Sequence, residues 1–270
     1  MKRTTLLLAA LAALALANAP ALAQVALQGS IALNWDQCYG DGSIYNKAFA
    51  CDTNAGFDEF VVSATPPADI PALVAATMVV DLEISSSSLT PWWNFDTGCR
   101  SFPSALSGSF VAPAVSACVD PWQGNASGGF NYISGFGGPD RGRIRSVCAL
   151  PTPVAVFANH ELFITRVRIA HTKTVGTAFC PGCMDPVCLM LSAVELDQNP
   201  GLGNITLVLP KPGTDSDLIT WQGAAARRQI YINPCPPDYI VIACPSKEMS
   251  CPSVTPTRRP TWGAIKGFYR

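Results

Sequence analysis

The stretch VVDLEI, residues 79–84, decides the fold class because its side chains alternate between apolar and charged. In an extended chain successive side chains point to opposite faces, so the apolar residues share one face while Asp81 and Glu83 share the other. This period of two predicts a β-strand that is buried on one face and meets water on the other.

Further strands are expected on both sides of that stretch. Residues 162–169 (LFITRVRI) repeat the alternation, with Arg166 and Arg168 facing water. Residues 187–196 (VCLMLSAVEL) are mostly apolar, which indicates a strand buried on both faces, although a short helix would also fit. Shorter candidates lie at residues 26–35, 48–51, 57–63, 107–111, 143–150, 154–157, 205–209, 229–232 and 239–243.

Turns separate these segments and complete the assignment of the fold. The chain holds 21 Gly and 23 Pro, spread over many short clusters that suit tight turns. Short strands at this spacing predict an all-β fold over residues 24–232, namely an antiparallel β-sandwich of jelly-roll or immunoglobulin-like type with roughly ten strands. Only residues 72–77 and 222–228 suit short helices.

The first residues have the pattern of a bacterial signal peptide, which we expect to occupy residues 1–23. Lys2 and Arg3 precede an apolar run, and Ala21 and Ala23 are the small residues that a signal peptidase requires. The run is shorter than the roughly 20 residues of a membrane span, which disfavours the alternative of a retained anchor. We therefore expect a secreted or cell-envelope protein whose mature chain has no transmembrane segment.

The charge balance argues against two classes of partner. The chain carries 18 Lys and Arg against 19 Asp and Glu, a formal net charge of −1. Loss of Lys2 and Arg3 with the signal peptide makes the mature chain more negative. Nucleic acids and anionic membranes attract basic surfaces, so neither is an expected partner.

The 11 cysteines of an exported chain predict disulfide bonds, and their odd number leaves at least one outside an internal pair. Because short loops close most easily, we expect the pairs Cys38–Cys51 and Cys99–Cys118. Two of the last three cysteines are expected to pair with each other or to tie the C-terminal segment to the body. The disulfide candidates are Cys38, Cys51, Cys99, Cys118, Cys180, Cys183, Cys235 and Cys244.

The motif CPGC at residues 180–183 admits three interpretations. A zinc site usually needs a second such pair or nearby histidines, and the only histidines are His160 and His171. A redox dithiol needs a helix behind its first cysteine, whereas the residues that follow suit a strand. We favour structural disulfides in a tight loop.

One loop spaces oxygen ligands like the first half of a calcium-binding loop. Residues 52–59 read DTNAGFDE, and Asp52, Asn54 and Asp58 would be the ligands. The closing Glu is missing, because Ser63 stands at its position, and a turn rich in Asp and Asn is the alternative. We expect no cofactor other than this calcium ion.

Trp92 and Trp93 are the strongest sign of binding in the sequence. Adjacent strand residues face opposite ways, so one ring would fill the core while the other would stack on a sugar. The alternative is that both rings pack inside. A cell-surface protein or a glycan is the expected partner.

Catalytic patterns are scarce. The chain contains neither a G-x-S-x-G elbow nor an H-E-x-x-H pair. The carboxylates of Asp81, Glu83, Glu161 and Glu195 leave a glycan-acting hydrolase open, although strand alternation favours solvated faces for them.

The C-terminal part differs from the body. Residues 233–256 carry six prolines and three cysteines, and this Pro/Cys-rich extension cannot be a regular central strand because each proline removes a ladder donor. Residues 257–270 are a basic and aromatic tail in which Trp262, Ile265 and Tyr269 recur at helical spacing. This tail is interpreted as a docking or sorting segment, or else as an end without fixed structure.

Several motifs together resemble those of an uncharacterised group of exported bacterial cysteine-rich β-domain proteins. They are LNWDQC (33–38), FACDTNAG (49–56), PWW (91–93), GCR (98–100), CPGC (180–183) and WGAIK (262–266). The resemblance implies export and a common β-domain, and it implies no activity.

We therefore expect a non-enzymatic exported protein, either a surface or envelope component or a binding module. An extracellular glycan-acting hydrolase and a calcium-stabilised adhesion-type domain are the alternatives.

Overall fold

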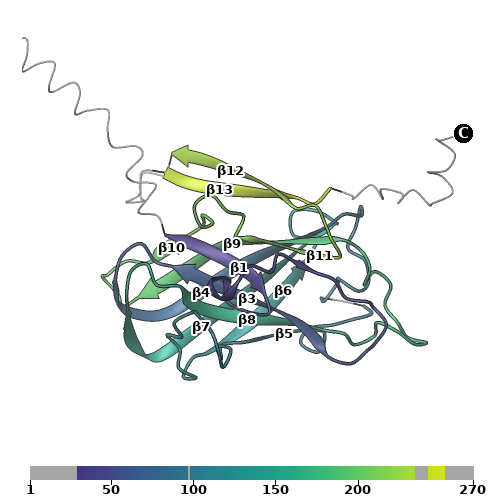
Figure 1. Ribbon diagram of the computed structural model, residues 1–270, viewed down its shortest axis with the longest axis horizontal. Coiled ribbons are helices and arrows are strands. Elements are labelled where there is room, and N and C mark those ends of the chain that lie inside the picture. The colour runs from purple at the N-terminus through teal and green to yellow at the C-terminus, as the bar shows by residue number, and fades with distance from the viewer. Residues whose placement is uncertain (1–28, 97, 235–242, 253–270) are drawn as a thin grey trace, which may run out of the picture.

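The computed structural model describes residues 29–96, 98–234 and 243–252, which fold into a disulfide-stapled β-sandwich (Figure 1). The strands form two large sheets and a separate two-stranded hairpin. One turn of 3-10 helix, η1 (Tyr39–Asp41), is the only helical element in these ranges. The predicted all-β sandwich is confirmed.

The first sheet has four antiparallel strands. Their order across the sheet is β1 (Ser30–Trp35), β3 (Phe57–Thr65), β8 (Leu162–Ala170) and β5 (Leu106–Ser109). Arg166 and Arg168 point outward from β8 and share Glu59 of β3, at 3.3 and 2.6 Å. The outer face of this sheet therefore carries its own ion pairs.

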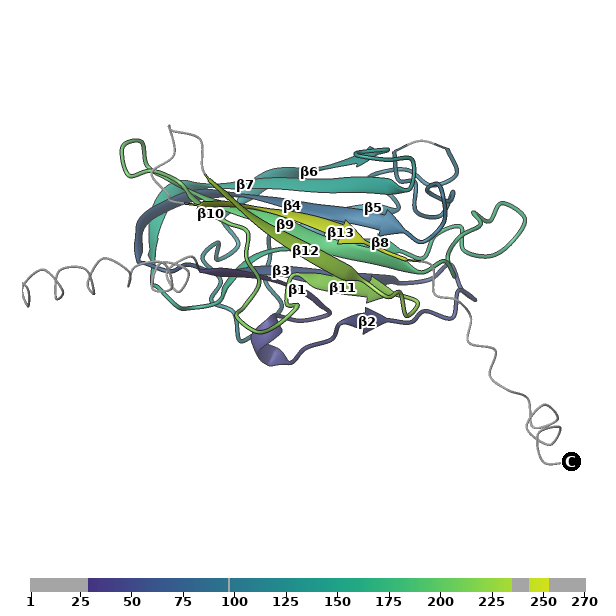
Figure 2. The same cartoon turned by 90° about the horizontal axis from the view of Figure 1, so that it is seen from above.

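The second sheet is larger and contains residues 79–84. Its order is β2 (Asn46–Lys47), β11 (Leu218–Trp221), β9 (Val187–Gln198), β4 (Ile70–Ile84), β7 (Arg141–Val156) and β6 (Ser127–Ser134), and β10 (Ile205–Leu207) also pairs with β9. The pairs are antiparallel except for β2 with β11. Figure 2 shows the long strands β4, β7 and β9 running side by side.

Side chains from both sheets meet in one apolar core. The ring centroid of Trp35 lies 5.8 Å from that of Phe60 and 5.9 Å from that of Trp221 on the second sheet. Along the second half of β4 every other side chain is buried, including Met78 and Val80. Full burial of one such side chain contributes about 1.5–3 kcal/mol. The alternation that predicts the strand therefore also holds the two sheets together.

A hairpin covers the outer face of the second sheet. It consists of β12 (Arg227–Pro234) and β13 (Ala243–Ser250), as Figures 1 and 2 show. Because of this cover Glu83 is buried and Asp81 is half-buried, so the solvated face predicted for them is wrong. The alternation of a strand identifies its polar face but does not show what lies over it.

Two predicted helices are also wrong. Residues 72–77 belong to β4, whose two edges pair with β7 and β9. Residues 222–228 form a turn that leads into β12. The predicted strands at 143–150 and 154–157 are parts of the single strand β7, and residues 48–51 are not a strand.

Four disulfides link the described residues: Cys38–Cys118, Cys51–Cys183, Cys99–Cys180 and Cys188–Cys251. The predicted pairs Cys38–Cys51 and Cys99–Cys118 are wrong. The bonds join cysteines 63 to 132 residues apart, because strand pairing already brings their loops together and short-loop closure gives no advantage. The bond at Cys251 confirms that the C-terminal segment is tied to the body, and Cys148 is a buried free thiol.

Several predictions fall outside the described residues. These are the signal peptide (1–23), Cys235, the side chain of Cys244, most of the strand at 239–243, and the tail with Trp262, Ile265 and Tyr269. The Pro/Cys-rich extension (233–256) is described in part, and there it contributes to β12 and β13. Within the described ranges, no helical segment has the length and apolar character that traversing a lipid bilayer demands.

Candidate functional site

Three loops cross between the two sheets at the same end of the sandwich. They are residues 48–56 before β3, residues 85–105 between β4 and β5, and residues 171–186 between β8 and β9. The strand register places them together, because Phe57 pairs with Ala170 in one sheet and Ile84 pairs with Val187 in the other. We call these three loops the braced end.

Two disulfides fasten the third loop to the other two. Cys51–Cys183 links it to the first loop, and Cys99–Cys180 links it to the second. With sequence separations of 132 and 81, each bond restricts the unfolded chain enough to stabilise the fold by about 4–5 kcal/mol. The two cysteines of the C-x-x-C motif therefore brace different neighbours, as the structural interpretation of the motif expects.

Hydrogen bonds to main-chain carbonyls of the third loop complete this bracing. The Trp92 amide donates to the Pro181 carbonyl at 3.0 Å, and the Trp221 indole donates to the Cys183 carbonyl at 2.7 Å. Gly182 has a φ of 113°, and a Cβ there would lie 2.0 Å from Thr90 Oγ1. Only glycine fits this close approach, so the turn at 180–183 is seated firmly on the core.

Trp92 and Trp93 lie in the second loop, and both are 0% exposed. The interpretation in which one ring is displayed is wrong, and the alternative, that both rings pack inside, is confirmed. Residues 91–93 form a turn in which the Trp93 amide donates to the Thr90 carbonyl at 2.9 Å, so strand alternation does not apply. Trp92 stacks on Trp221 with centroids 5.5 Å apart, and Trp93 meets Phe95 at 6.0 Å. Neither ring offers a face to a sugar.

A buried guanidinium supports the second loop. Arg100 lies 3.7 Å from the Trp92 ring centroid and donates to the carbonyls of Trp92 and Ala170. Burial lowers the pKa of Arg100 to about 9, because the charged form loses its hydration. The carbonyl dipoles and the indole face offset that loss, and the contacts join the loop to β8.

Two of the three predicted calcium ligands, Asn54 and Asp58, have other partners. Asp58 is buried, with Oδ2 2.9 Å from His171 Nε2 and Oδ1 3.2 Å from Lys47 Nζ. Asn54 accepts two backbone amides of the third loop, and Asp52 is exposed. In the described ranges no three His, Cys, Asp or Glu side chains gather as a metal site requires. The calcium prediction gains no support from this arrangement.

The four carboxylates considered for glycan hydrolysis are each engaged by a polar side chain. The pairs are Asp81 with Arg143 (2.6 Å), Glu83 with Arg141 (2.9 Å), Glu161 with Lys211 (2.9 Å) and Glu195 with Asn204 (2.9 Å). Hydrolysis of a glycosidic bond needs two carboxyls that face one cleft, one acting as an acid. Asp81 and Glu83 are the pair that lines a common cavity.

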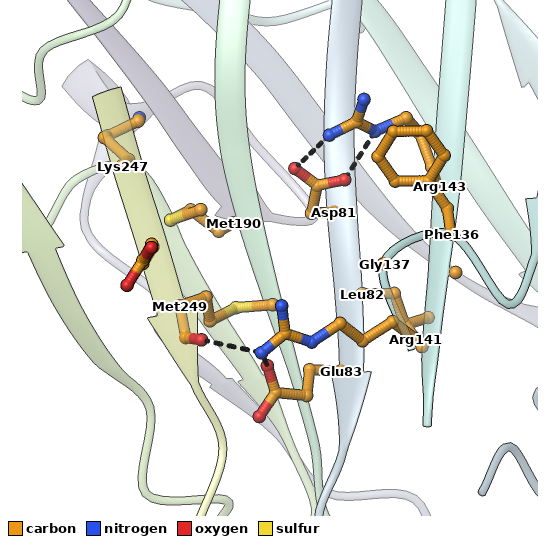
Figure 3. A pocket seen from close by; sticks show the side chains of 12 residues that line it. Asp81, Leu82, Glu83, Phe136, Gly137, Arg141, Arg143, Met190, Lys247 and Met249 are labelled. Atoms are coloured by element: carbon orange, nitrogen blue, oxygen red, sulfur yellow. Dashed lines mark hydrogen bonds and ion pairs between the residues drawn. The ribbon is translucent and has the colours of Figure 1, made fainter. Parts of the chain in front are cut away.

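This cavity, of about 140 Å³, lies between β4, β7 and the hairpin (Figure 3). The Arg143 guanidinium bonds both oxygens of Asp81 and lies 3.6 Å from the ring centroid of Phe136. Figure 3 shows Arg141 reaching Glu83 and the main-chain oxygen of Met249. Both carboxylates in the cavity are therefore paired with arginines. Such pairs suit attachment of the hairpin better than catalysis.

A second group of charges fastens the hairpin. Asp217 is fully buried, with Oδ2 2.7 Å from Lys247 Nζ of β13 and Oδ1 bonded to Arg228 of β12. Burial lowers the pKa of Lys247, and the negative charge of Asp217 opposes that change. Removing one member of such a buried group costs about 3–5 kcal/mol. We call Asp217, Lys247 and Arg228 the hairpin anchor.

Comparison with protein-family models, with curated proteins and with solved structures finds no match. The site is therefore identified by geometry. Phe179 and Met184 flank the turn at 180–183 and are 54% and 60% exposed. A fixed loop with apolar side chains can bind a complementary surface without first losing entropy to ordering. Neither residue is predicted from the sequence, where their one signal is their position beside the C-x-x-C motif.

Proposed function

We propose that this protein is an exported, non-enzymatic binding module of the bacterial cell surface or envelope, and that the braced end recognises a protein partner. The observation that carries the proposal is the loop at 171–186, which two disulfides brace while Phe179 and Met184 stay exposed. Aromatic and Met side chains are enriched in protein interfaces, and rigid loops lose little entropy on binding.

Two observations support export. Residues 1–23 combine a basic start, an apolar run and small residues before the expected cleavage site. Four disulfides in the described part of the chain fit an oxidising compartment outside the cytoplasm.

The class of partner and the absence of catalysis are both inferred from candidate side chains that are buried or already paired. The indoles of Trp92 and Trp93 are buried, so a protein surface is a better partner than a glycan. Asp81 and Glu83 each face an arginine, which disfavours the hydrolase alternative. The engagement of Asp58 by Lys47 and His171 likewise disfavours a calcium-stabilised adhesion domain.

The braced end can be tested against a matched pair at the opposite end of the sandwich. Phe157 follows β7 and Leu202 lies between β9 and β10, and they are 65% and 52% exposed. Labelled mature protein would be titrated onto envelopes of the organism that encodes it. We expect Phe179→Ser with Met184→Ser to weaken binding at least about tenfold. Phe157→Ser with Leu202→Ser should leave binding unchanged.

Treatment of the envelopes separates the two classes of partner. Protease should abolish binding, and periodate, which destroys glycans, should not. Equal binding by the two double variants would contradict the role of the braced end, and loss of binding after periodate alone would contradict a protein partner.

A further inference from the structure

The edges of the two large sheets differ in how they are protected. In the described part of the chain, β1 and β5 end the first sheet, and β2 and β6 end the main order of the second. An edge strand exposes unpaired backbone N–H and C=O groups that can pair with another strand. Natural proteins shield such edges by covering them, by keeping them short, or by placing charges and prolines on them.

Most of these edges are shielded. The amides of Ile31 and Leu33 on β1 donate to the carbonyls of Leu209 and Ser216, at 2.8 and 2.6 Å, so a loop covers that edge. Strands β5 and β2 have only four and two residues. Where β7 extends beyond β6, Pro151 and others of its residues are exposed, and the prolines limit pairing there.

Strand β6 has none of these protections. Its eight residues read SGGFNYIS, without a charge or a proline. It pairs with β7, and Figure 2 shows it as the outermost strand of its sheet. Ser127, Gly128, Gly129 and Asn131 are exposed. The longest edge strand of the second sheet is therefore also its most open one among the described residues.

Inward contacts fix the conformation of β6 within a single chain. The Phe130 ring stacks on Phe110 with centroids 5.1 Å apart and covers Gly108 of β5, where a Cβ would lie 1.9 Å from the ring. The Tyr132 hydroxyl donates to the Trp93 carbonyl at 2.9 Å. These inward contacts fix the extended backbone, so a pairing strand would not have to order it.

We propose that β6 pairs antiparallel with β6 of a second copy of this chain, which joins the two large sheets across a twofold axis. An antiparallel strand on such an axis meets its own sequence in reverse, so a charge near the axis would lie close to the same charge in the partner. The uncharged sequence of β6 removes that repulsion. This inference is independent of the function proposed for the braced end.

The nearest cations do not oppose this pairing. Arg145 of β7 pairs with Asn131 and is exposed on the outer face. In the dimer its backbone would lie at least three strand spacings from its counterpart, about 14 Å or more. That distance exceeds the Debye length of about 8 Å at physiological salt, so the repulsion is largely screened.

Sedimentation of the mature protein over a concentration series, with free thiols alkylated, tests the proposal. We expect a reversible monomer–dimer equilibrium. Gly129→Lys should weaken the dimer at least about tenfold because it adds a positive charge from each copy to the edge that the two copies share. No atom lies within 4 Å of a Cβ built at Gly129, so the monomer should keep its fold, and Asn131→Lys provides a second variant.

Val147→Lys is the matched control. Val147 lies opposite Gly129 on β7 and is partly exposed, so the same charge enters the same face one strand inside the edge. Its dimer should match that of the unaltered chain. A chain that stays monomeric throughout, or a dimer that Val147→Lys weakens as much as Gly129→Lys, would overturn the edge pairing. If the chain stays monomeric but binds a synthetic SGGFNYIS peptide, the partner of β6 is a peptide strand and not a second copy of the chain.

Discussion

The braced end and the β12–β13 hairpin are both fastened to the sandwich, but the means differ and so do the surfaces that result. The loop at 171–186 is held by two disulfides and by main-chain hydrogen bonds, and its own side chains Phe179 and Met184 stay exposed. The hairpin is held by one disulfide and by charged side chains that turn inward to Asp217. The loop therefore keeps apolar side chains exposed, whereas the charged side chains of the hairpin are buried against the sheet.

Removal of a brace should have the largest effect on the molecule. Cys51→Ser with Cys183→Ser should lower the free energy of unfolding by about 5 kcal/mol, because this bond has a sequence separation of 132. Cys188→Ser with Cys251→Ser, at the hairpin, has a separation of 63 and should cost about 4 kcal/mol. Urea unfolding of both double variants measures the difference. If the Cys188→Ser with Cys251→Ser variant had the lower free energy of unfolding, the order expected for the two regions would be wrong.

The hairpin anchor should come next. Asp217→Asn leaves Lys247 and Arg228 without a buried carboxylate and should cost about 3 kcal/mol. Asp215→Asn is the control, because Asp215 also pairs with Arg228 but is mostly exposed, and it should cost less than about 1 kcal/mol. Hydrogen exchange should show that Asp217→Asn exposes the hairpin amides while the braced end stays protected. Equal loss of protection at both regions would mean that they are not held separately.

Cys148 shows how a cysteine behaves without a covalent partner. Burial raises the pKa of this thiol to about 12, whereas an unfolded thiol has a pKa of about 8.5. The folded chain therefore binds more protons than the unfolded chain between these values, and the free energy of unfolding falls as the pH rises through that range. The expected slope is at most about 1.4 kcal/mol per pH unit. Urea unfolding at pH 8 and pH 10 should show a steeper decline in the parent than in Cys148→Ala; equal declines would refute it.

The smallest effect is expected at the exposed residues of the braced end. Phe179→Ser with Met184→Ser should change the free energy of unfolding by no more than about 0.5 kcal/mol, because these side chains are largely in solvent already. Thermal unfolding beside Phe157→Ser with Leu202→Ser measures this directly. A loss of several kcal/mol would show that the two side chains support the fold and would remove the contrast with the hairpin.

Periodicity predicts much of the fold because most strands have one apolar face. The alternation over residues 79–84 and 162–169 lies within β4 and β8. Residues 72–77 resemble a helix only locally, and pairing with β7 and β9 decides their conformation. Strand β6 escapes prediction because SGGF has little strand propensity, and its conformation depends on Phe130 and Tyr132 packing inward.

The candidate site is less accessible to such reasoning. The C-x-x-C motif marks the loop, but the partners of Cys180 and Cys183 come from loops that only the folded sheets bring near. Trp92 and Trp93 point inward because a turn replaces the expected strand. Asp217 stands in a polar segment without periodicity, and its role depends wholly on the hairpin above it.

The Cys188–Cys251 bond also determines how the molecule would carry mechanical force. Residues 189–250 lie within the covalent ring that it closes, so tension applied to the chain beyond Cys251 enters β9 directly and bypasses the hairpin. Strand β9 is paired with β4 along one edge and with β10 and β11 along the other, which spreads the load over many bonds. Under tension on its C-terminal end, the protein would therefore keep the β12–β13 hairpin in place on the second sheet.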